Sequence, residues 1–170
     1  MRGDVTLTSV PGQGVTARAE LMVPVVAQPS ATASDAVPAR LPAMRVLAVE
    51  DNATNRIILQ SMLQALGVAT VIVADGESAL DRFRAERFDA VLLDIAMPGM
   101  DGVQTLDALT RLAATLGLPA PRAVAVTANV MTHQVDDYLA GGFTAVVAKP
   151  IRMDMLGQAL WQCLGRSLPA

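Results

Sequence analysis

From residue 44 onward, short apolar runs alternate with segments whose apolar residues recur at helical spacing, and this alternation is the strongest constraint on the fold. The apolar runs predict strands over 46–49, 68–74, 90–94, 123–127 and 143–148. The segment after each run predicts a helix, which makes five β-α units. Such units favour a parallel sheet with helices on both faces. We therefore predict a doubly wound α/β fold.

Polar residues stand where these apolar runs end. Glu50 and Asp51 follow the first run, and Asp94 closes the third. Thr127 closes the fourth run, and Lys149 follows the fifth. Because the carboxyl ends of parallel strands meet at one edge of a sheet, where ligands bind in such folds, we expect these side chains to lie together.

The residue types at this edge are those that phosphoryl transfer to a carboxylate requires. Asp94 can be the nucleophile, and Glu50 and Asp51 can join it in holding Mg²⁺ or Mn²⁺ through oxygen ligands. Thr127 can donate its hydroxyl to a phosphoryl oxygen, and Lys149 can bring its ammonium group to the acyl phosphate.

Each residue alone also fits a structural role. Glu50 and Asp51 could cap the following helix, where acids suit the helix dipole. Asp94 could be a turn residue, Thr127 an ordinary strand-end hydroxyl and Lys149 a solvated loop residue. The occurrence of all of them at strand ends favours a shared site. Two other residues are expected to be structural. Asp101 is expected to cap the third helix or to shape its loop, and His133 to be an exposed residue that starts the fourth helix.

Residues 44–166 resemble the receiver domain of two-component response regulators. Four segments carry the resemblance: Val49-Glu50-Asp51-Asn52, Leu93-Asp94-Ile95-Ala96-Met97-Pro98-Gly99-Met100-Asp101-Gly102, Val126-Thr127-Ala128 and Ala148-Lys149-Pro150-Ile151. The resemblance implies a flavodoxin-like, five-stranded parallel sheet of order 2-1-3-4-5 flanked by five helices. It implies phosphorylation of Asp94. It also implies that metal is held by Asp51, Asp94, the backbone carbonyl of Ala96 and, through water, Glu50.

The form Glu50-Asp51-Asn52-Ala53-Thr54-Asn55 resembles receivers attached to hybrid histidine kinases. Residues 1–26 read as two strands around the turn Pro11-Gly12-Gln13-Gly14, and they resemble the last hairpin of a histidine-kinase ATP-binding domain. The nucleotide-binding boxes of that family have no match here, so neither ATP binding nor kinase activity is expected. Residues 27–43 are rich in Ala, Pro and Ser and predict a linker, and 167–170 form a short tail. The whole is expected to be a piece of a hybrid kinase.

One position departs from the family pattern. Relatives commonly carry Tyr or Phe three residues before the lysine, where the ring turns inward on phosphorylation, and here that residue is Val146. We therefore expect phosphorylation to cause a weaker or different rearrangement, or the domain mainly to relay phosphate. Phe143 is nearby in sequence but is expected to point elsewhere.

The composition limits the classes of partner that the chain is expected to bind. A net charge of −3 over 170 residues provides no basic field for nucleic acid. No apolar stretch reaches the roughly 18 residues of a membrane span, and the first residues lack the pattern of a signal peptide. Cytoplasmic location is expected, with any membrane anchor in the parent kinase.

The single cysteine, Cys163, suits a core position in a reducing compartment. The resemblance implies a histidine-bearing kinase domain as donor and a histidine phosphotransfer protein as a possible acceptor.

Three other functions are weighed against the phosphoacceptor. A pseudo-receiver would keep the fold as an interaction module without the chemistry, and the complete acid, threonine and lysine set disfavours it. A phosphohydrolase with an aspartate nucleophile needs a second acid two residues later, where this chain has Ala96. A DNA-binding regulator is disfavoured because no effector domain follows residue 170.

Overall fold

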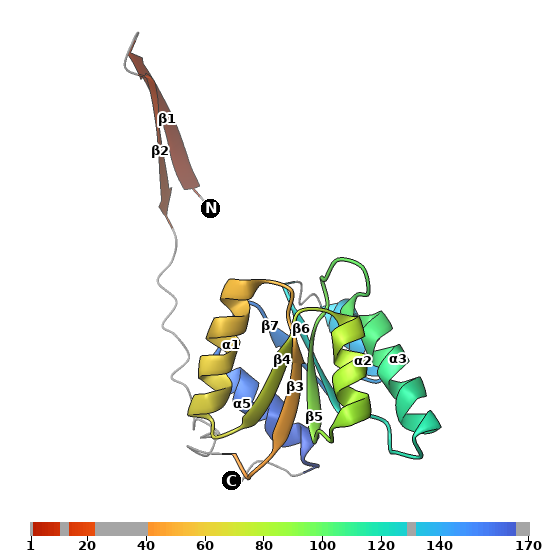
Figure 1. The fold of residues 1–170 in the computed structure, drawn as a ribbon. Helices are drawn as coiled ribbons and strands as arrows, with labels where there is room; N and C mark the ends of the chain where they lie inside the picture. The colour runs from red at the N-terminus through yellow and green to blue at the C-terminus, as the bar shows by residue number, and fades with distance from the viewer. Residues whose placement is uncertain (1, 11–13, 23–40, 129–131, 166–170) are drawn as a thin grey trace. The chain divides into compact units, whose positions relative to one another are not determined.

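The computed structural model describes residues 2–10, 14–22, 41–128 and 132–165. Contacts divide the chain into two units, Met1–Ser34 and Asp35–Ala170. The first unit contains a hairpin in which β1 (Arg2–Val10) pairs antiparallel with β2 (Gly14–Met22), as the sequence pattern predicts (Figure 1). Most of its predicted turn and most of the predicted linker lie outside the described residues.

The second unit is built on a parallel sheet. The strands are β3 (Arg45–Val49), β4 (Ala69–Val73), β5 (Ala90–Asp94), β6 (Ala123–Thr127) and β7 (Ala145–Ala148). Within the described residues, their order is β4-β3-β5-β6-β7 and every neighbouring pair is parallel. This confirms the predicted order 2-1-3-4-5. The last strand begins two residues later than predicted, because the amide of Phe143 donates to the Tyr138 carbonyl in the turn that precedes it.

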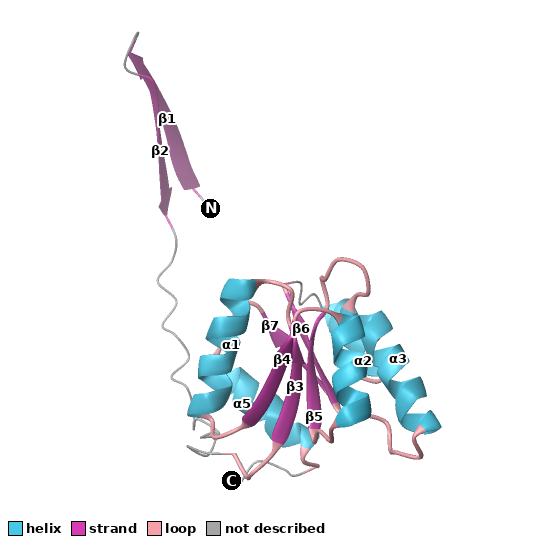
Figure 2. Ribbon diagram, viewed as in Figure 1, coloured by secondary structure: helices cyan, strands magenta, loops and turns pink. Residues whose placement is uncertain are grey.

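Helices cover both faces of this sheet (Figure 2). They are α1 (Ala53–Ala65), α2 (Gly76–Ala85), α3 (Gly102–Thr115), α4 (Thr132–Ala140) and α5 (Met153–Cys163). One buried cluster joins the sheet to α1 and α5, and a second joins it to α2, α3 and the Tyr138 side chain of α4. Asp101 caps α3 in a reciprocal pair with Gln104, which confirms the predicted cap.

Alternate strand residues face opposite clusters, and both faces are buried. In β3, Val46 and Ala48 belong to the cluster under α1 and α5, whereas Leu47 and Val49 belong to the other. A doubly covered sheet therefore explains why the strands read as uninterrupted apolar runs. The acids and Thr127 stand where β3, β5 and β6 leave the core, at the carboxyl ends of these strands.

Packing in the second unit begins before residue 44. Leu41 is buried in the cluster under α1, and its amide donates to the Leu66 carbonyl at 3.1 Å. At the other end, Cys163 is buried as expected, and burial raises the pKa of its thiol to about 11. His133 is exposed, also as expected. None of the described helices combines the length and apolar character needed to cross a membrane.

Candidate active site at the carboxyl edge of the sheet

Asp94 is the last residue of β5, and its side chain is almost wholly buried, with 4% exposed. Its Oδ2 accepts from Lys149 Nζ at 2.6 Å, and its Oδ1 accepts from the Ala96 amide at 3.2 Å. The following amide, of Ile95, donates to the Val126 carbonyl of β6 at 2.9 Å. The neighbouring strand therefore anchors the backbone at the point where the carboxylate leaves the core.

Glu50 and Asp51 follow β3 and differ in environment. The Glu50 side chain is 2% exposed, while Asp51 is open to solvent. Glu50 Oε2 accepts from Lys149 Nζ at 2.8 Å. Its Oε1 accepts from Asn55 Nδ2 at 2.8 Å and from the Asn52 amide at 3.3 Å. Both Glu50 oxygens are thus engaged by protein donors, which fits contact with a metal through water better than direct ligation.

Lys149 is the cation that the two buried carboxylates share. Burial alone would lower the pKa of Lys149, but hydrogen bonds with Asp94 and Glu50 and the charges of both acids outweigh it, so the pKa is raised. Lys149 is therefore charged at neutral pH. Its contribution to stability is present below the ordinary lysine pKa and is lost as the pH rises through the raised value.

Thr127 lies at the same edge of the sheet. It is 4% exposed, ends β6 and is paired in register with Ala148. Its carbonyl accepts from the Lys149 amide at 2.8 Å, which ties the ends of β6 and β7 together. The peptide bond between Lys149 and Pro150 is cis. The catalytic role of the Thr127 hydroxyl stays a prediction.

The acids form a cluster suited to a hard divalent cation. One carboxylate oxygen from each of Glu50, Asp51 and Asp94 can be chosen so that all three lie within 4.8 Å of one another. Carboxylate oxygens are the ligands that Mg²⁺ and Mn²⁺ prefer, so the donor set fits either ion. Ala96 is exposed beside this cluster. Its carbonyl as a further ligand stays a prediction.

Three contributors to the site are absent from the predicted set. Asn52 caps α1 by accepting from the amides of Thr54 and Asn55. Asn55 also holds Glu50, and Arg56 donates to the backbone carbonyls of Glu50 and Asp51. One sequence signal could have pointed to Arg56: a positive charge in the first turn of a helix is unfavourable, so it calls for a compensating contact.

Gly102 lets α3 approach the strand that ends in Asp94. A Cβ at this position would lie 2.4 Å from the Asp94 carbonyl oxygen and 2.9 Å from the Ile95 Cα. We expect Gly102→Ala to lower the free energy of unfolding by about 2–3 kcal/mol, because the backbone of β5 must shift to make room. Urea denaturation measures this cost.

The matched control is Gly117→Ala. Gly117 has a φ of +68° but nothing within 4 Å of an added Cβ, so only backbone strain applies there. That variant should cost about 1 kcal/mol. Equal costs at the two positions would contradict a close approach at Gly102.

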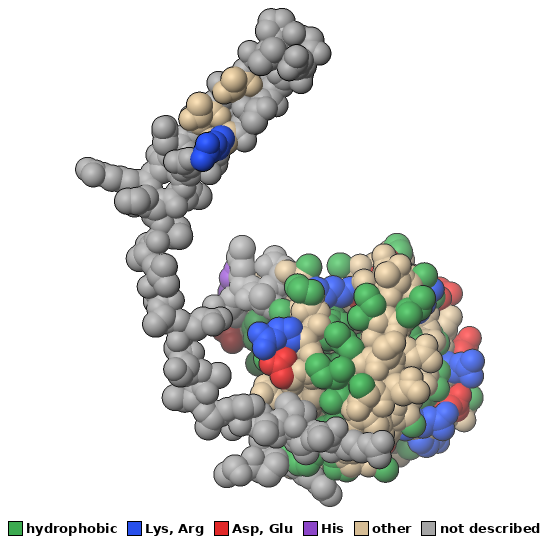
Figure 3. Space-filling model, turned by 90° about the vertical axis from the view of Figure 1, so that its left-hand side faces the viewer, with side chains coloured by type: hydrophobic (Ala, Val, Ile, Leu, Met, Phe, Trp, Pro, Cys, Tyr) green, Lys and Arg blue, Asp and Glu red, His purple; other side chains and the backbone are tan. Residues whose placement is uncertain are grey.

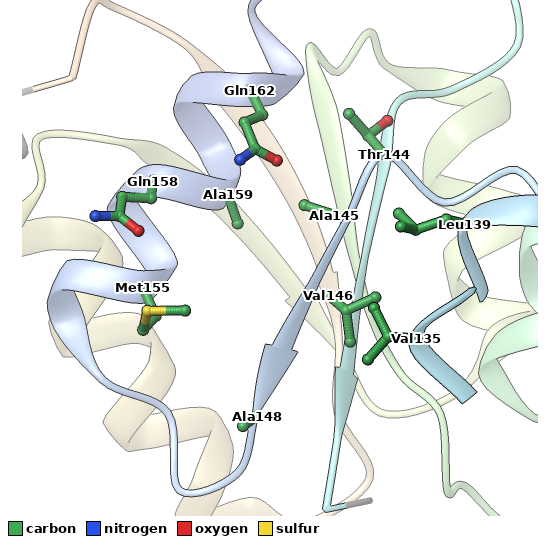
Figure 4. Close-up of a pocket in the computed structure, with 10 residues that line it drawn as sticks. All are labelled: Val135, Leu139, Thr144, Ala145, Val146, Ala148, Met155, Gln158, Ala159 and Gln162. Atoms are coloured by element: carbon green, nitrogen blue, oxygen red, sulfur yellow. The ribbon is translucent and has the colours of Figure 1, made fainter. Parts of the chain in front are cut away.

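Val146 lies away from the acids, on a hollow of about 480 Å³ between α4, β7 and α5. Figure 4 shows its side chain beside that of Val135, with Leu139 further along the same wall. Phe143 is buried and packs edge to face on Tyr138, with ring centroids 6.0 Å apart. Phe143 thus packs on Tyr138 of α4 and is not among the residues that line the hollow beside Val146.

Comparison with known proteins agrees with this fold. A model of the response regulator receiver domain matches residues 46–160. The chain is 37% identical over 156 residues to the aerobic respiration control sensor protein ArcB of Escherichia coli (strain K12), covering 92% of this chain and 20% of ArcB. It is 35% identical over 168 residues to the sensor histidine kinase AruS of Pseudomonas aeruginosa, covering 99% of this chain and 16% of AruS. It thus spans a fifth or less of these relatives.

A solved structure adds a likeness in three dimensions. The receiver domain of the sensor histidine kinase PA1611 from Pseudomonas aeruginosa PAO1 has a magnesium ion coordinated in its active-site cleft. It is 29% identical, with a TM-score of 0.60 over 74% of this chain and 100% of that domain. The chain belongs to the response regulator receiver domain family.

Proposed function

We propose that Asp94 accepts a phosphoryl group from a phosphohistidine, as the receiver step of a two-component phosphorelay. The observation that carries the proposal is the shared cation: Lys149 contacts both Asp94 and Glu50, and Asp51 completes an acid cluster beside them. This arrangement combines a nucleophile, a place for a divalent ion and a positive charge beside the nucleophile.

In the proposed reaction, an Asp94 oxygen attacks phosphorus, the bond from phosphorus to the histidine nitrogen breaks, and the imidazole leaves and takes up a proton. Lys149 then contacts a phosphoryl oxygen instead of Asp94 Oδ2, while Glu50 keeps its hold on the ammonium. The Thr127 hydroxyl donates to a second phosphoryl oxygen. A divalent ion held by Asp51, Asp94 and the Ala96 carbonyl, with Glu50 through water, would neutralise phosphoryl charge.

The alternative is a pseudo-receiver that keeps the fold but not the chemistry. Incubation with acetyl phosphate separates the two functions. We expect a phosphorylated band on a phosphate-affinity gel in Mg²⁺ and none in EDTA, because the carboxylate cluster needs its counter-ion for transfer. A chain that folds but shows no band in Mg²⁺ would favour the pseudo-receiver.

Apolar side chains border the site and support a helical partner. Ile57 and Ile58 of α1 are 68% and 49% exposed, and Met153 of α5 is 38% exposed. A pocket of about 150 Å³ beside them is lined by Glu50, Asn55, Ile58, Lys149, Pro150 and Ile151. Figure 3 shows hydrophobic side chains gathered on the face to which α1 contributes. An amphipathic helix bearing the donor or acceptor histidine, from a kinase dimerisation domain or a phosphotransfer protein, fits such a surface.

The longer protein is proposed to be a hybrid sensor kinase with this domain on the cytoplasmic side. The hairpin of β1 and β2 would then be the end of the ATP-binding domain, followed by a linker that ends before Leu41, which packs in the receiver core. Support comes from the alignment with AruS, which covers 99% of this chain and so includes the hairpin.

The small side chain of Val146 favours phosphate relay over a large displacement of α4 and β7. A phosphomimic structure with a large displacement would contradict that preference.

A further inference from the structure

The first turn of α1 places a cation directly behind the acid pair. Arg56 Nη1 donates to the Glu50 carbonyl at 2.9 Å and to the Asp51 carbonyl at 2.6 Å. Both acids follow Val49, the last residue of β3. One guanidinium nitrogen, with its two N–H groups, thus serves two successive carbonyls as the chain leaves the sheet.

This position has two local electrostatic costs. The N-terminal end of a helix is the positive end of its dipole, and the first turn of α1, which is fully described, holds no acidic residue to offset Arg56. A positive charge near an acid cluster also opposes the binding of a second cation there. Arg56 is nevertheless half-buried and directed at the loop. These contacts therefore position the backbone of the loop and do not serve to supply a favourable charge.

We propose that Arg56 is a positioning residue for the metal site, an inference that rests on the proposed function of the acid cluster. Asp51 is exposed, so packing does little to orient its carboxylate, and the orientation depends on the backbone that Arg56 holds. Asn55 acts on the same loop from one residue earlier by holding the Glu50 carboxylate. The two side chains together fix both acids against α1.

Arg56→Met separates positioning from charge because the two predict opposite signs. Loss of the positive charge alone would tighten the binding of a divalent ion. Loss of the backbone contacts would loosen it, by about 10-fold, as is usual when a residue that orients metal ligands is removed. The readout is titration with Mn²⁺, in which electron paramagnetic resonance counts the free ion, at fixed ionic strength on the whole chain.

The matched control is Arg84→Met on α2, where the arginine pairs with the exposed Asp81. Its affinity for Mn²⁺ should equal that of the unmodified chain. Affinity that is unchanged or tighter in Arg56→Met would overturn the proposal. If Arg56→Met does not fold, Arg56→Gln is titrated in its place and judged by the same outcomes. Failure of the unmodified chain to bind Mn²⁺ would instead refute the proposed metal site itself.

Discussion

In EDTA, Lys149→Met is expected to lower the free energy of unfolding by about 3 kcal/mol, because two buried carboxylates lose the cation that they share. Glu50 and Asp94 are only 2% and 4% exposed at their side chains, and Lys149 lies within 2.8 Å of both. Without Lys149, their like charges face each other with little solvent to screen them. Urea denaturation with and without Mg²⁺ measures the effect.

Addition of Mg²⁺ should restore part of this loss, since an ion bound to the folded state stabilises it and offsets the repulsion. Arg152→Met is the control: Arg152 pairs with Asp154 at 2.7 Å, but its side chain is 74% exposed, so its loss should change stability by less than about 1 kcal/mol. Equal losses in the two variants, or a loss at Lys149 that Mg²⁺ leaves unchanged, would contradict the shared-cation account.

Asp94→Asn is expected to reduce phosphorylation by acetyl phosphate to background. The amide oxygen is too weak a nucleophile, although the side chain keeps nearly the same shape. The matched control is Asp107→Asn on α3, an exposed acid that pairs with Arg111. It should be phosphorylated at the same rate as the unmodified chain. Intact-mass measurement over time checks both variants. A phosphorylated Asp94→Asn chain would show that another residue accepts the phosphoryl group.

Much of the fold is predictable because strands that are buried on both faces appear in the sequence as nearly continuous apolar runs. The apolar runs 46–49 and 90–93 lie buried in β3 and β5, and an acid follows each of them. The apolar pattern predicts the start of β7 two residues too early, since Phe143 is as apolar as a strand residue but its amide donates in the turn after α4. The apolar character of Phe143 alone does not show whether this residue lies in the strand or in the turn before it.

The boundary of the predicted linker is a second difference. Leu41 lies in a Pro- and Ala-rich segment, yet it packs in the core.

The sequence predicts that the acids and Lys149 lie at one edge of the sheet, but it predicts neither their contacts nor the part played by Asn52, Asn55 and Arg56. Strand order brings Glu50 and Lys149 to one edge although 99 residues separate them. The Lys149 ammonium bridges Glu50 and Asp94 because of how the three side chains lie in the fold, and no local sequence pattern predicts that arrangement. The same holds for Arg56, whose partners are backbone carbonyls and therefore carry no residue type to recognise.

The central claim is that Asp94 itself carries the phosphoryl group. Borohydride reduction after phosphorylation by acetyl phosphate and Mg²⁺ converts a phosphorylated aspartate into homoserine, which tandem mass spectrometry locates by residue. The account predicts homoserine at position 94 and an intact aspartate at position 51, with no conversion in EDTA. Homoserine at position 51, or at any position other than 94, would contradict it.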